Sequence, residues 1–383
     1  MKRIITILTV SAVFLFSFSF TAFAENEDAV SVKAKAAVLM DVATGNVLYS
    51  FNENEQLYPA SVTKIMPLLL FMEAIDSGKI TLDETVTASP TAAAKGGSQI
   101  WLKEGEQMTV DELLRATAIA SANDACTALG EHIAGSEEGF VKMMNDRAKE
   151  LGMKNTHFVN CSGLDDDTTE HLTTAYDIAL MSRELLKHER IKTYTTVWMD
   201  TLRNGETELT NTNRLVRFYN GTTGLKTGTT SKAGHCLSAS AERDSLHLIA
   251  VVMGSDNSTD RFEGAKALLN WGFANYETVT PEIDSSLITD VRVLKGIDEY
   301  VKPKIEGLES LTLKAGQKDS LTTEISLATD VEAPVEENQI LGKVTLKIGE
   351  KTVGEYNLTA ENAVGKINLW IMMSRILKSI TKA

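Results

Sequence analysis

Two pairs of short apolar runs, one early and one late in the chain, predict strands of a single sheet. Residues 36–40 and 47–51 are mostly apolar and flank a turn sequence that contains Gly45, as in a β-hairpin. The second pair, 234–241 and 246–253, is separated by a turn of four polar residues. Each pair is therefore expected to form two antiparallel strands joined by a short turn.

Helical spacing dominates the chain between these two pairs. Apolar residues recur at intervals of three and four from about 62 to 190, and again after the second pair, from about 260 to 275. Thr109 and Glu112 form a Thr-x-x-Glu capping box ahead of an apolar run, which is typical of a helix start. Strands early and late with helices between them predict an α+β domain whose sheet is assembled from both ends.

The pattern changes after Tyr276. Residues 277–360 contain short segments in which apolar and polar residues alternate, as they do in half-buried strands. These segments are 290–294, 311–313, 324–327, 344–348 and 354–358. We therefore expect a small all-β domain over 277–360, following a larger domain over 25–276.

The two ends of the chain are positively charged, whereas its body is negatively charged. The 383 residues carry a net charge of −14, of which residues 1–24 contribute +2 and residues 361–383 contribute +3, leaving −19 between them. This acidic body argues against nucleic acid as a partner. Hydrophobic residues make up 43% and charged residues 23%, which excludes wholesale disorder.

The N-terminal end has the form of a secretory signal peptide. Lys2 and Arg3 precede an apolar run over 4–20, and Ala22 and Ala24 form a small-x-small cleavage site. We expect cleavage after Ala24 and export of the remaining chain. An uncleaved membrane anchor stays open as the alternative, because the apolar run approaches spanning length.

The C-terminal end, residues 361–383, is predicted to form an amphipathic helix. It is too short and too charged to span a bilayer, but an apolar face with a Trp opposite basic residues suits a helix lying in the membrane interface. The apolar face consists of Leu369, Trp370, Met372, Met373, Ile376, Leu377 and Ile380. A helix docked on the protein's own core is the alternative.

Ser61 and Lys64 are the first candidate catalytic pair. Pro59 disfavours an earlier helix start, so Ser61 is expected at the N-terminus of a very apolar helix, with Lys64 one turn later on the same side. A buried lysine with a lowered pKa can take the proton of a serine nucleophile. Ser-x-x-Lys also arises by chance, and Ser61 as a helix cap with a solvated Lys64 is the alternative.

Two further motifs follow in order along the chain. Ser121 and Asn123 stand in a short break between two predicted helices, from which both side chains can reach one cleft. Lys226 and Thr227 precede the late strand pair, and Gly228 after them allows close approach of a ligand backbone. Each triplet alone is commonplace, whereas the ordered set Ser-x-x-Lys, Ser-x-Asn and Lys-Thr-Gly is specific.

With this set, the chain resembles the D-alanyl-D-alanine carboxypeptidases, which are serine-type, low-molecular-mass penicillin-binding proteins. The stretches 97–100, 121–126, 151–156 and 224–230 are also similar to that family. The resemblance implies a DD-peptidase/β-lactamase-like catalytic domain with a helical subdomain, a β-rich second domain and a C-terminal amphipathic anchor. It places the protein at the outer face of the cytoplasmic membrane, in the cell wall space.

The resemblance also implies serine acyl transfer. Ser61 would attack the carbonyl between the two terminal D-alanines of a peptidoglycan stem peptide, with Lys64 as general base. Ser121 and Lys226 would relay a proton to the leaving D-alanine, and water would then hydrolyse the acyl-enzyme. β-Lactam antibiotics would acylate the same serine as covalent inhibitors.

The remaining residues of the motifs would bind the substrate. Asn123 would hold the substrate amide, while Lys226 and the Thr227 hydroxyl would bind the terminal carboxylate beside Gly228. The N–H groups of Ser61 and Thr229 would form the oxyanion hole. No cofactor or metal is expected, because the sequence contains neither His-Glu-x-x-His nor clustered cysteine ligands.

Three features leave questions open. The family places a carboxylate-binding cation near Thr212, which is not an arginine, and Arg214 or Arg217 is the candidate replacement. Cys126 is expected to be a small buried apolar side chain, and an odd total of three cysteines leaves at least one unpaired.

Two other functions stay open. One is a serine β-lactamase, although no Glu-x-x-x-Asn site is found between Asn123 and Lys226. The other is a wall-binding module with a decayed active site.

Overall fold

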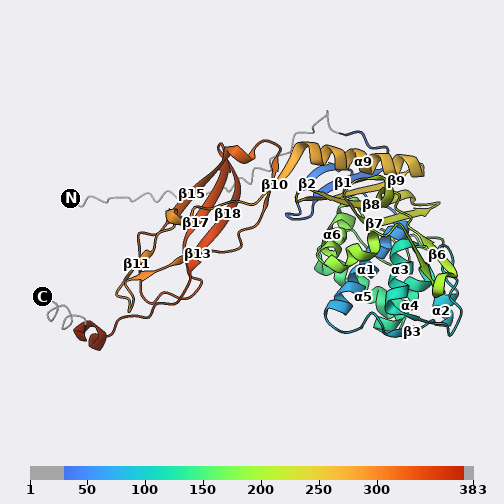
Figure 1. The fold of residues 1–383 in the computed structure, drawn as a ribbon, viewed down its shortest axis with the longest axis horizontal. Helices are drawn as coiled ribbons and strands as arrows, with labels where there is room; N and C mark the ends of the chain where they lie inside the picture. Colours follow the sequence, from blue (N-terminus) through green and yellow to red (C-terminus); the bar gives the residue numbers. More distant parts are fainter. Residues whose placement is uncertain (1–29, 375–383) are drawn as a thin grey trace, which may run out of the picture. The chain divides into compact units, whose positions relative to one another are not determined.

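A five-stranded antiparallel sheet is the central feature of the computed structural model, which describes residues 30–374 (Figure 1). The strands lie in the order β2-β1-β9-β8-β7, so that β1 pairs with β9 from the far end of the domain. This arrangement confirms a sheet built from both ends. The bounds are β1 Ala36–Asp41, β2 Val47–Phe51, β7 Thr222–Thr230, β8 Gly234–Arg243 and β9 Leu246–Ser255.

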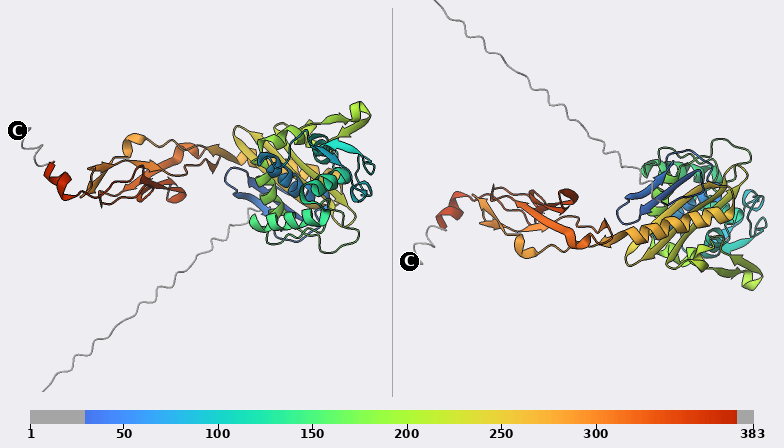
Figure 2. Two further views of the ribbon diagram at one scale, coloured as in Figure 1. Left: turned by 90° about the horizontal axis from the view of Figure 1, so that it is seen from below. Right: turned by 90° about the horizontal axis from the view of Figure 1, so that it is seen from above.

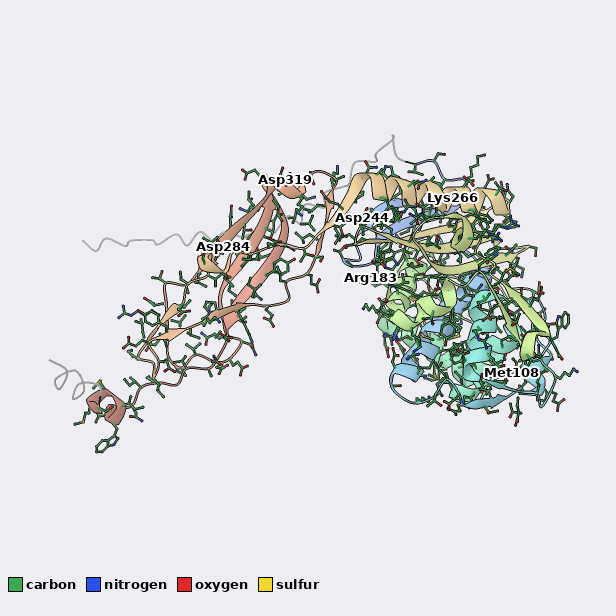
Figure 3. All side chains as sticks on the ribbon, viewed as in Figure 1. Met108, Arg183, Asp244, Lys266, Asp284 and Asp319 are labelled. Atoms are coloured by element: carbon green, nitrogen blue, oxygen red, sulfur yellow. The ribbon has the colours of Figure 1, made fainter. Side chains whose placement is uncertain are left out.

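The turn between β8 and β9 is shorter than the sequence predicted. The strands run on through Arg243 and begin again at Leu246, so only Asp244 and Ser245 form the turn (Figure 3 labels Asp244). Both residues have positive φ, 47° and 66°. Two residues of positive φ match the right-handed twist of paired strands, which explains the tight turn.

Helices cover both faces of this sheet. Helix α9 (Ser258–Asn275) packs against β8 and β9, and α6 (Ala175–Leu186) packs against β1 and β9 from the other side (Figures 1 and 2). Every residue of β1 is consequently buried. The unbroken apolar run over 36–40, without alternating polar residues, reflects this burial on both faces of the sheet.

The predicted helical region forms a cluster on the α6 side of the sheet. The capping box is confirmed, because Thr109 Oγ1 accepts from Glu112 N at 3.2 Å and Glu112 Oε2 accepts from Thr109 N at 2.9 Å. The rings of Phe71 and Phe140 stack at 5.3 Å in the core of the cluster. Its helices, besides α6, are α1 Ile65–Asp76, α2 Pro90–Ala93, α3 Val110–Ile119, α4 Asn123–Ala134 and α5 Glu137–Glu150. Two short helices that were not predicted follow, α7 Lys192–Thr195 and α8 Leu215–Phe218.

Two small antiparallel strand pairs, one within this region and one after it, were not predicted. Strands β3 (Thr85–Thr87) and β4 (Gln107–Thr109) pair with each other, as do β5 (Met199–Leu202) and β6 (Thr207–Thr210). Strands of three or four residues are too short to show a clear period in the sequence. Further 3₁₀ turns are η2 Glu189–Ile191, η3 Arg203–Gly205, η4 Ser285–Leu287 and η5 Lys318–Ser320.

The region after α9 consists of short strands, as predicted. They form three small sheets, β10-β14, β12-β11-β16 and β13-β18-β17-β15, around two apolar clusters. Strands β10, β12, β13 and β16 had not been predicted. The bounds are β10 Tyr276–Val279, β11 Val291–Leu294, β12 Tyr300–Val301, β13 Pro303–Ile305, β14 Leu311–Lys314, β15 Leu321–Leu327, β16 Asp330–Glu332, β17 Ile340–Ile348 and β18 Lys351–Ala360.

The predicted terminal segments are described only in part. The signal peptide assigned to residues 1–24 lies outside the described residues, as does 375–383 of the C-terminal helix. A helical turn does begin after Asn368, whose Oδ1 accepts from Ile371 N at 2.9 Å. Trp370 on this turn is 80% exposed. Within residues 30–374, no helix is long and apolar enough to cross a membrane.

Candidate active site

Ser61 lies in a 3₁₀ turn, η1 (Ala60–Lys64), that leads directly into α1. The α-helix therefore begins four residues later than the sequence predicted. Neighbouring segments press closely on this turn: a Cβ on Gly163 would lie 1.9 Å from Ala60 O, and a Cβ on Gly228 would lie 2.6 Å from Pro59 O. Only a residue without a Cβ can lie this close to the turn, and these two contacts fix the position of Ser61.

Lys64 is completely buried and lies against Ser61. Its Nζ donates to Ser61 Oγ at 3.1 Å, to Asn123 Oδ1 at 2.6 Å and to the carbonyl oxygen of Ser162 at 2.9 Å. No carboxylate among the described residues accepts a hydrogen bond from Lys64. Because burial disfavours the charged ammonium, the pKa of Lys64 falls to about 8. The alternative of a solvated lysine is excluded by this burial.

Ser121 lies in the break between α3 and α4, as predicted, whereas Asn123, predicted in the same break, is the first residue of α4. Ser121 has a positive φ of 65°, and its buried Oγ has no hydrogen-bond partner among the described residues. Asn123 is 2% exposed, and its Nδ2 donates to Gly96 O at 2.6 Å while its backbone N–H donates to Ser98 O at 2.7 Å. These bonds orient the Asn123 amide so that its oxygen faces Lys64.

Lys226, Thr227 and Gly228 lie on β7, an edge strand that packs against η1. Lys226 is 1% exposed, and its Nζ donates to Thr227 O at 3.2 Å. Burial holds the pKa of Lys226 well below its usual range, and the positive charges of Lys64 and Arg261 lower it further. The first and third motifs therefore share one site.

A cation that was not predicted from the sequence, Arg261, lies beside Gly228 and Thr229. Arg261 lies on α9, and its Nη1 donates to Gly228 O at 3.0 Å and to Thr229 Oγ1 at 2.9 Å. Thr212 does lie where expected, since its Oγ1 accepts from Thr227 Oγ1 at 2.7 Å. Arg261 follows the last motif by 33 residues, so no local pattern links the two.

The three cysteines are free and buried. Cys126 is 0% exposed, as expected of a small apolar side chain, and its Sγ contacts Cys161 O at 3.5 Å. Burial raises the pKa of Cys236 to about 11, which keeps that thiol protonated and unreactive near neutral pH. Within residues 30–374, no three His, Cys, Asp or Glu side chains are grouped to hold a metal ion.

Comparison with known proteins gives two family matches that together span most of the chain. A family described as D-alanyl-D-alanine carboxypeptidase matches residues 21–257, and one described as penicillin-binding protein 5, C-terminal domain, matches residues 276–366. The carboxypeptidase DacF of Bacillus subtilis is 40% identical over 390 residues, covering 100% of both chains. The carboxypeptidase DacC of Escherichia coli is 37% identical and covers 90% of this chain and 88% of its own.

Solved structures agree with these matches. Penicillin-binding protein 5 from Haemophilus influenzae superposes with a TM-score of 0.79 at 32% identity, covering 88% of this chain and 99% of its own. Penicillin-binding protein D2 from Listeria monocytogenes, in its ampicillin-bound form, has a TM-score of 0.59 at 32% identity and covers 64% of this chain and 99% of its own.

Proposed function

Because the chain belongs to the D-alanyl-D-alanine carboxypeptidase family of serine hydrolases, we propose that Ser61 is its nucleophile and Lys64 its general base. The observation that carries this assignment is the 3.1 Å contact between the Nζ of the fully buried Lys64 and Ser61 Oγ. A neutral Lys64 takes the Ser61 proton as the serine oxygen bonds to the D-alanyl carbonyl carbon.

The acyl-enzyme forms when the bond between that carbon and the amide nitrogen breaks. The leaving D-alanine needs a proton on its amine, and we assign its delivery to Ser121 and Lys226. Both side chains are buried, and the Ser121 hydroxyl has no competing partner among the described residues. Water then adds to the acyl carbon, and Ser61 recovers its proton.

We assign substrate binding to the edge strand β7. The terminal carboxylate is assigned to Thr227 and Lys226, with positive charge from Arg261, and the substrate amide to Asn123. The backbone N–H groups of Ser61 and Thr229 form the oxyanion hole. A stem peptide can add to this edge as an extra antiparallel strand, because β7 has a free side. β-Lactams acylate Ser61 in the same geometry.

The pH dependence of acylation tests the role of Lys64. Only the neutral amine accepts a proton, and the pKa of Lys64 is about 8. The rate constant for penicillin acylation is therefore expected to rise about tenfold per pH unit below pH 8 and to level off above it. Stopped-flow measurement of acylation between pH 5.5 and 9.5 provides the profile. A rate that stays flat across pH 6–8 would remove Lys64 from the role of base.

Family members act on peptidoglycan, which lies outside the cytoplasm, and the protein is therefore exported. We propose that residues 1–24 are the export signal, that 25–276 and 277–360 are the catalytic and β-rich domains, and that 361–383 hold the protein at the outer face of the membrane. In support of a membrane contact, Leu369, Trp370, Met372 and Met373 are between 44% and 80% exposed, so they are not docked on the described core.

Removal of residues 369–383 tests the membrane contact. The truncation keeps the buried Val364, which forms a β-bridge with Val335 in the β-rich region. We expect that the shortened protein no longer sediments with anionic liposomes but still releases D-alanine from a soluble peptide at the wild-type rate. Equal sedimentation of the full and shortened proteins would refute the anchor.

A further inference from the structure

A cavity of about 840 Å³ lies between the tip of the β5–β6 hairpin and the segment that follows Ser98. Its lining residues come from two stretches of the chain, 100–106 and 203–208. Arg203 joins the two stretches, because its Nη1 donates to Ile100 O at 2.9 Å and its Nε donates to Glu106 Oε1 at 2.7 Å. None of the residues in these stretches has a role in the proposed reaction.

The segment 96–102 connects this cavity to the active site. Asn123 holds the start of the segment, since its Nδ2 donates to Gly96 O at 2.6 Å and its backbone N–H donates to Ser98 O at 2.7 Å. Trp101 follows Ser98 by three residues, so their Cα atoms lie within about 11 Å of each other. A substrate whose amide binds Asn123 therefore has the cavity within reach of its more distant groups.

Trp101 is held in solvent at this cavity by a fixed backbone. It is 77% exposed, and its φ of 61° lies in the left-handed region that residues with a Cβ rarely adopt. Its neighbours are fixed, because the N–H groups of Ile100 and Leu102 donate to Oδ2 of the buried Asp124 at 3.1 and 3.0 Å. An exposed indole on a strained backbone is costly in the free protein, and this cost points to a ligand.

The polar groups around the Trp101 ring include both donors and acceptors. The exposed Lys103 supplies donors, and Glu104, Glu206 and Glu208 supply acceptors and form no ion pair within residues 30–374. These carboxylates disfavour an anionic or lipid ligand, and a cationic ligand would meet the positive charges of the two basic lining residues. An aromatic face with mixed donors and acceptors suits a neutral ligand that has hydroxyl groups and one apolar face.

Peptidoglycan carries such a group near each stem peptide, because the peptide is attached by its N-terminus to an N-acetylated amino sugar. The apolar face of a sugar ring can stack on an indole, while its hydroxyl and acetamido groups form hydrogen bonds with charged side chains. Four stem residues precede the scissile bond and span about 13 Å when extended, which is comparable to the reach from Asn123 to the cavity. Cavities of about 300–1,000 Å³ also hold ligands of this size.

We propose that this cavity binds an amino sugar of the glycan strand, with one face of the sugar ring stacked on Trp101. The enzyme then favours stem peptides that are still attached to glycan. This inference rests on the proposed function, since the same Ser61 acyl-enzyme forms. The sugar lies away from the scissile bond, so its contact is the same before and during the reaction. It therefore lowers KM and leaves kcat unchanged.

Matched substrates test this proposal. One stem peptide ending in D-Ala-D-Ala is prepared with an N-terminal acetyl group or with the N-acetylated amino-sugar disaccharide, and kcat and KM for D-alanine release are measured for each. The wild-type KM is expected to be about tenfold lower for the disaccharide substrate, on the scale of one well-placed aromatic contact. Trp101→Ala should bring this ratio to about one, whereas Trp101→Tyr, which keeps an aromatic face, should preserve most of it.

Tyr300→Ala is the matched control. Tyr300 is an exposed aromatic residue on β12, 55% exposed, that does not line the cavity. Its replacement should leave the KM ratio at the wild-type value. A thermal melt of Trp101→Ala shows whether the variant is folded, and the Trp101→Tyr variant tests the aromatic contact independently.

The outcomes distinguish the sugar from other ligands and the cavity from the active site. Acetylated peptides with lysine or norleucine at the third position reveal a cationic ligand: if Trp101→Ala weakened binding of the lysine peptide alone, the cavity would bind an ammonium group and the sugar assignment would be wrong. Equal wild-type KM values for the acetylated and disaccharide substrates, with normal D-alanine release, would overturn this inference and leave the proposed function intact. A folded wild-type protein that cleaves none of the substrates would overturn both.

Discussion

Replacement of Ser61 by alanine is expected to lower kcat/KM for D-alanine release by about 10⁴-fold or more. Acyl transfer has no other nucleophile in this account, because the Ser121 hydroxyl is assigned to proton transfer and the thiols are buried. Loss of a catalytic serine in hydrolases of this mechanism costs about 10⁴–10⁶-fold. The measurement is D-alanine release from a peptide ending in D-Ala-D-Ala, for wild type and Ser61→Ala at equal concentrations.

Ser77→Ala is the matched control for this substitution. Ser77 lies at the exposed C-terminal end of α1, and its hydroxyl donates only to the backbone oxygens of Glu73 and Ala74. The control should retain full activity. Ser61→Ala should also retain the wild-type unfolding temperature, because the serine is only partly buried. Substantial D-alanine release by a folded Ser61→Ala protein would contradict the assignment.

Replacement of Lys64 by methionine is expected to slow acylation by about 10³-fold or more while the active site still binds ligand. Methionine keeps much of the apolar volume of the buried stem but cannot accept the proton of Ser61. The Asn123 and Ser162 oxygens also lose their donor, so a decrease in stability of about 1–3 kcal/mol is expected alongside the kinetic loss. Penicillin acylation followed by rapid quench and mass spectrometry gives the rate constant.

Lys79→Met is the matched control for this loss. Lys79 is exposed just after α1, and its replacement should leave both the acylation rate and the unfolding temperature unchanged. A thermal melt of Lys64→Met distinguishes loss of the base from loss of the fold. Wild-type acylation in a folded Lys64→Met protein would show that another group removes the serine proton.

The sequence predicted the large elements well because their patterns are long. The hairpin β1–β2, the pair β8–β9 and helix α9 each carry ten or more residues of consistent pattern, and the capping box at Thr109 marks a helix start by local hydrogen bonds alone. The β3–β4 pair and the β5–β6 hairpin were missed, since strands of three or four residues carry almost no periodic signal.

The candidate site was predictable only where its residues lie in short motifs. Ser61 and Lys64 are separated by one turn, and their contact follows from local geometry. Arg261 reaches Gly228 only because α9 packs on β8 and β9, a tertiary contact that no local spacing records. The 3₁₀ geometry of the Ser61 turn was also missed; Gly163 and Gly228 approach this turn from distant parts of the chain, which no local pattern records.

Mapping a penicillin adduct to its residue is the most direct test of the account. The full chain is incubated with a β-lactam, digested and sequenced by tandem mass spectrometry, with the intact mass followed over time. We expect one adduct per chain, located on Ser61, absent in Ser61→Ala and lasting far longer than its formation takes. An adduct on any other residue would contradict the catalytic assignment, and rapid penicillin hydrolysis without a persistent adduct would indicate a β-lactamase instead.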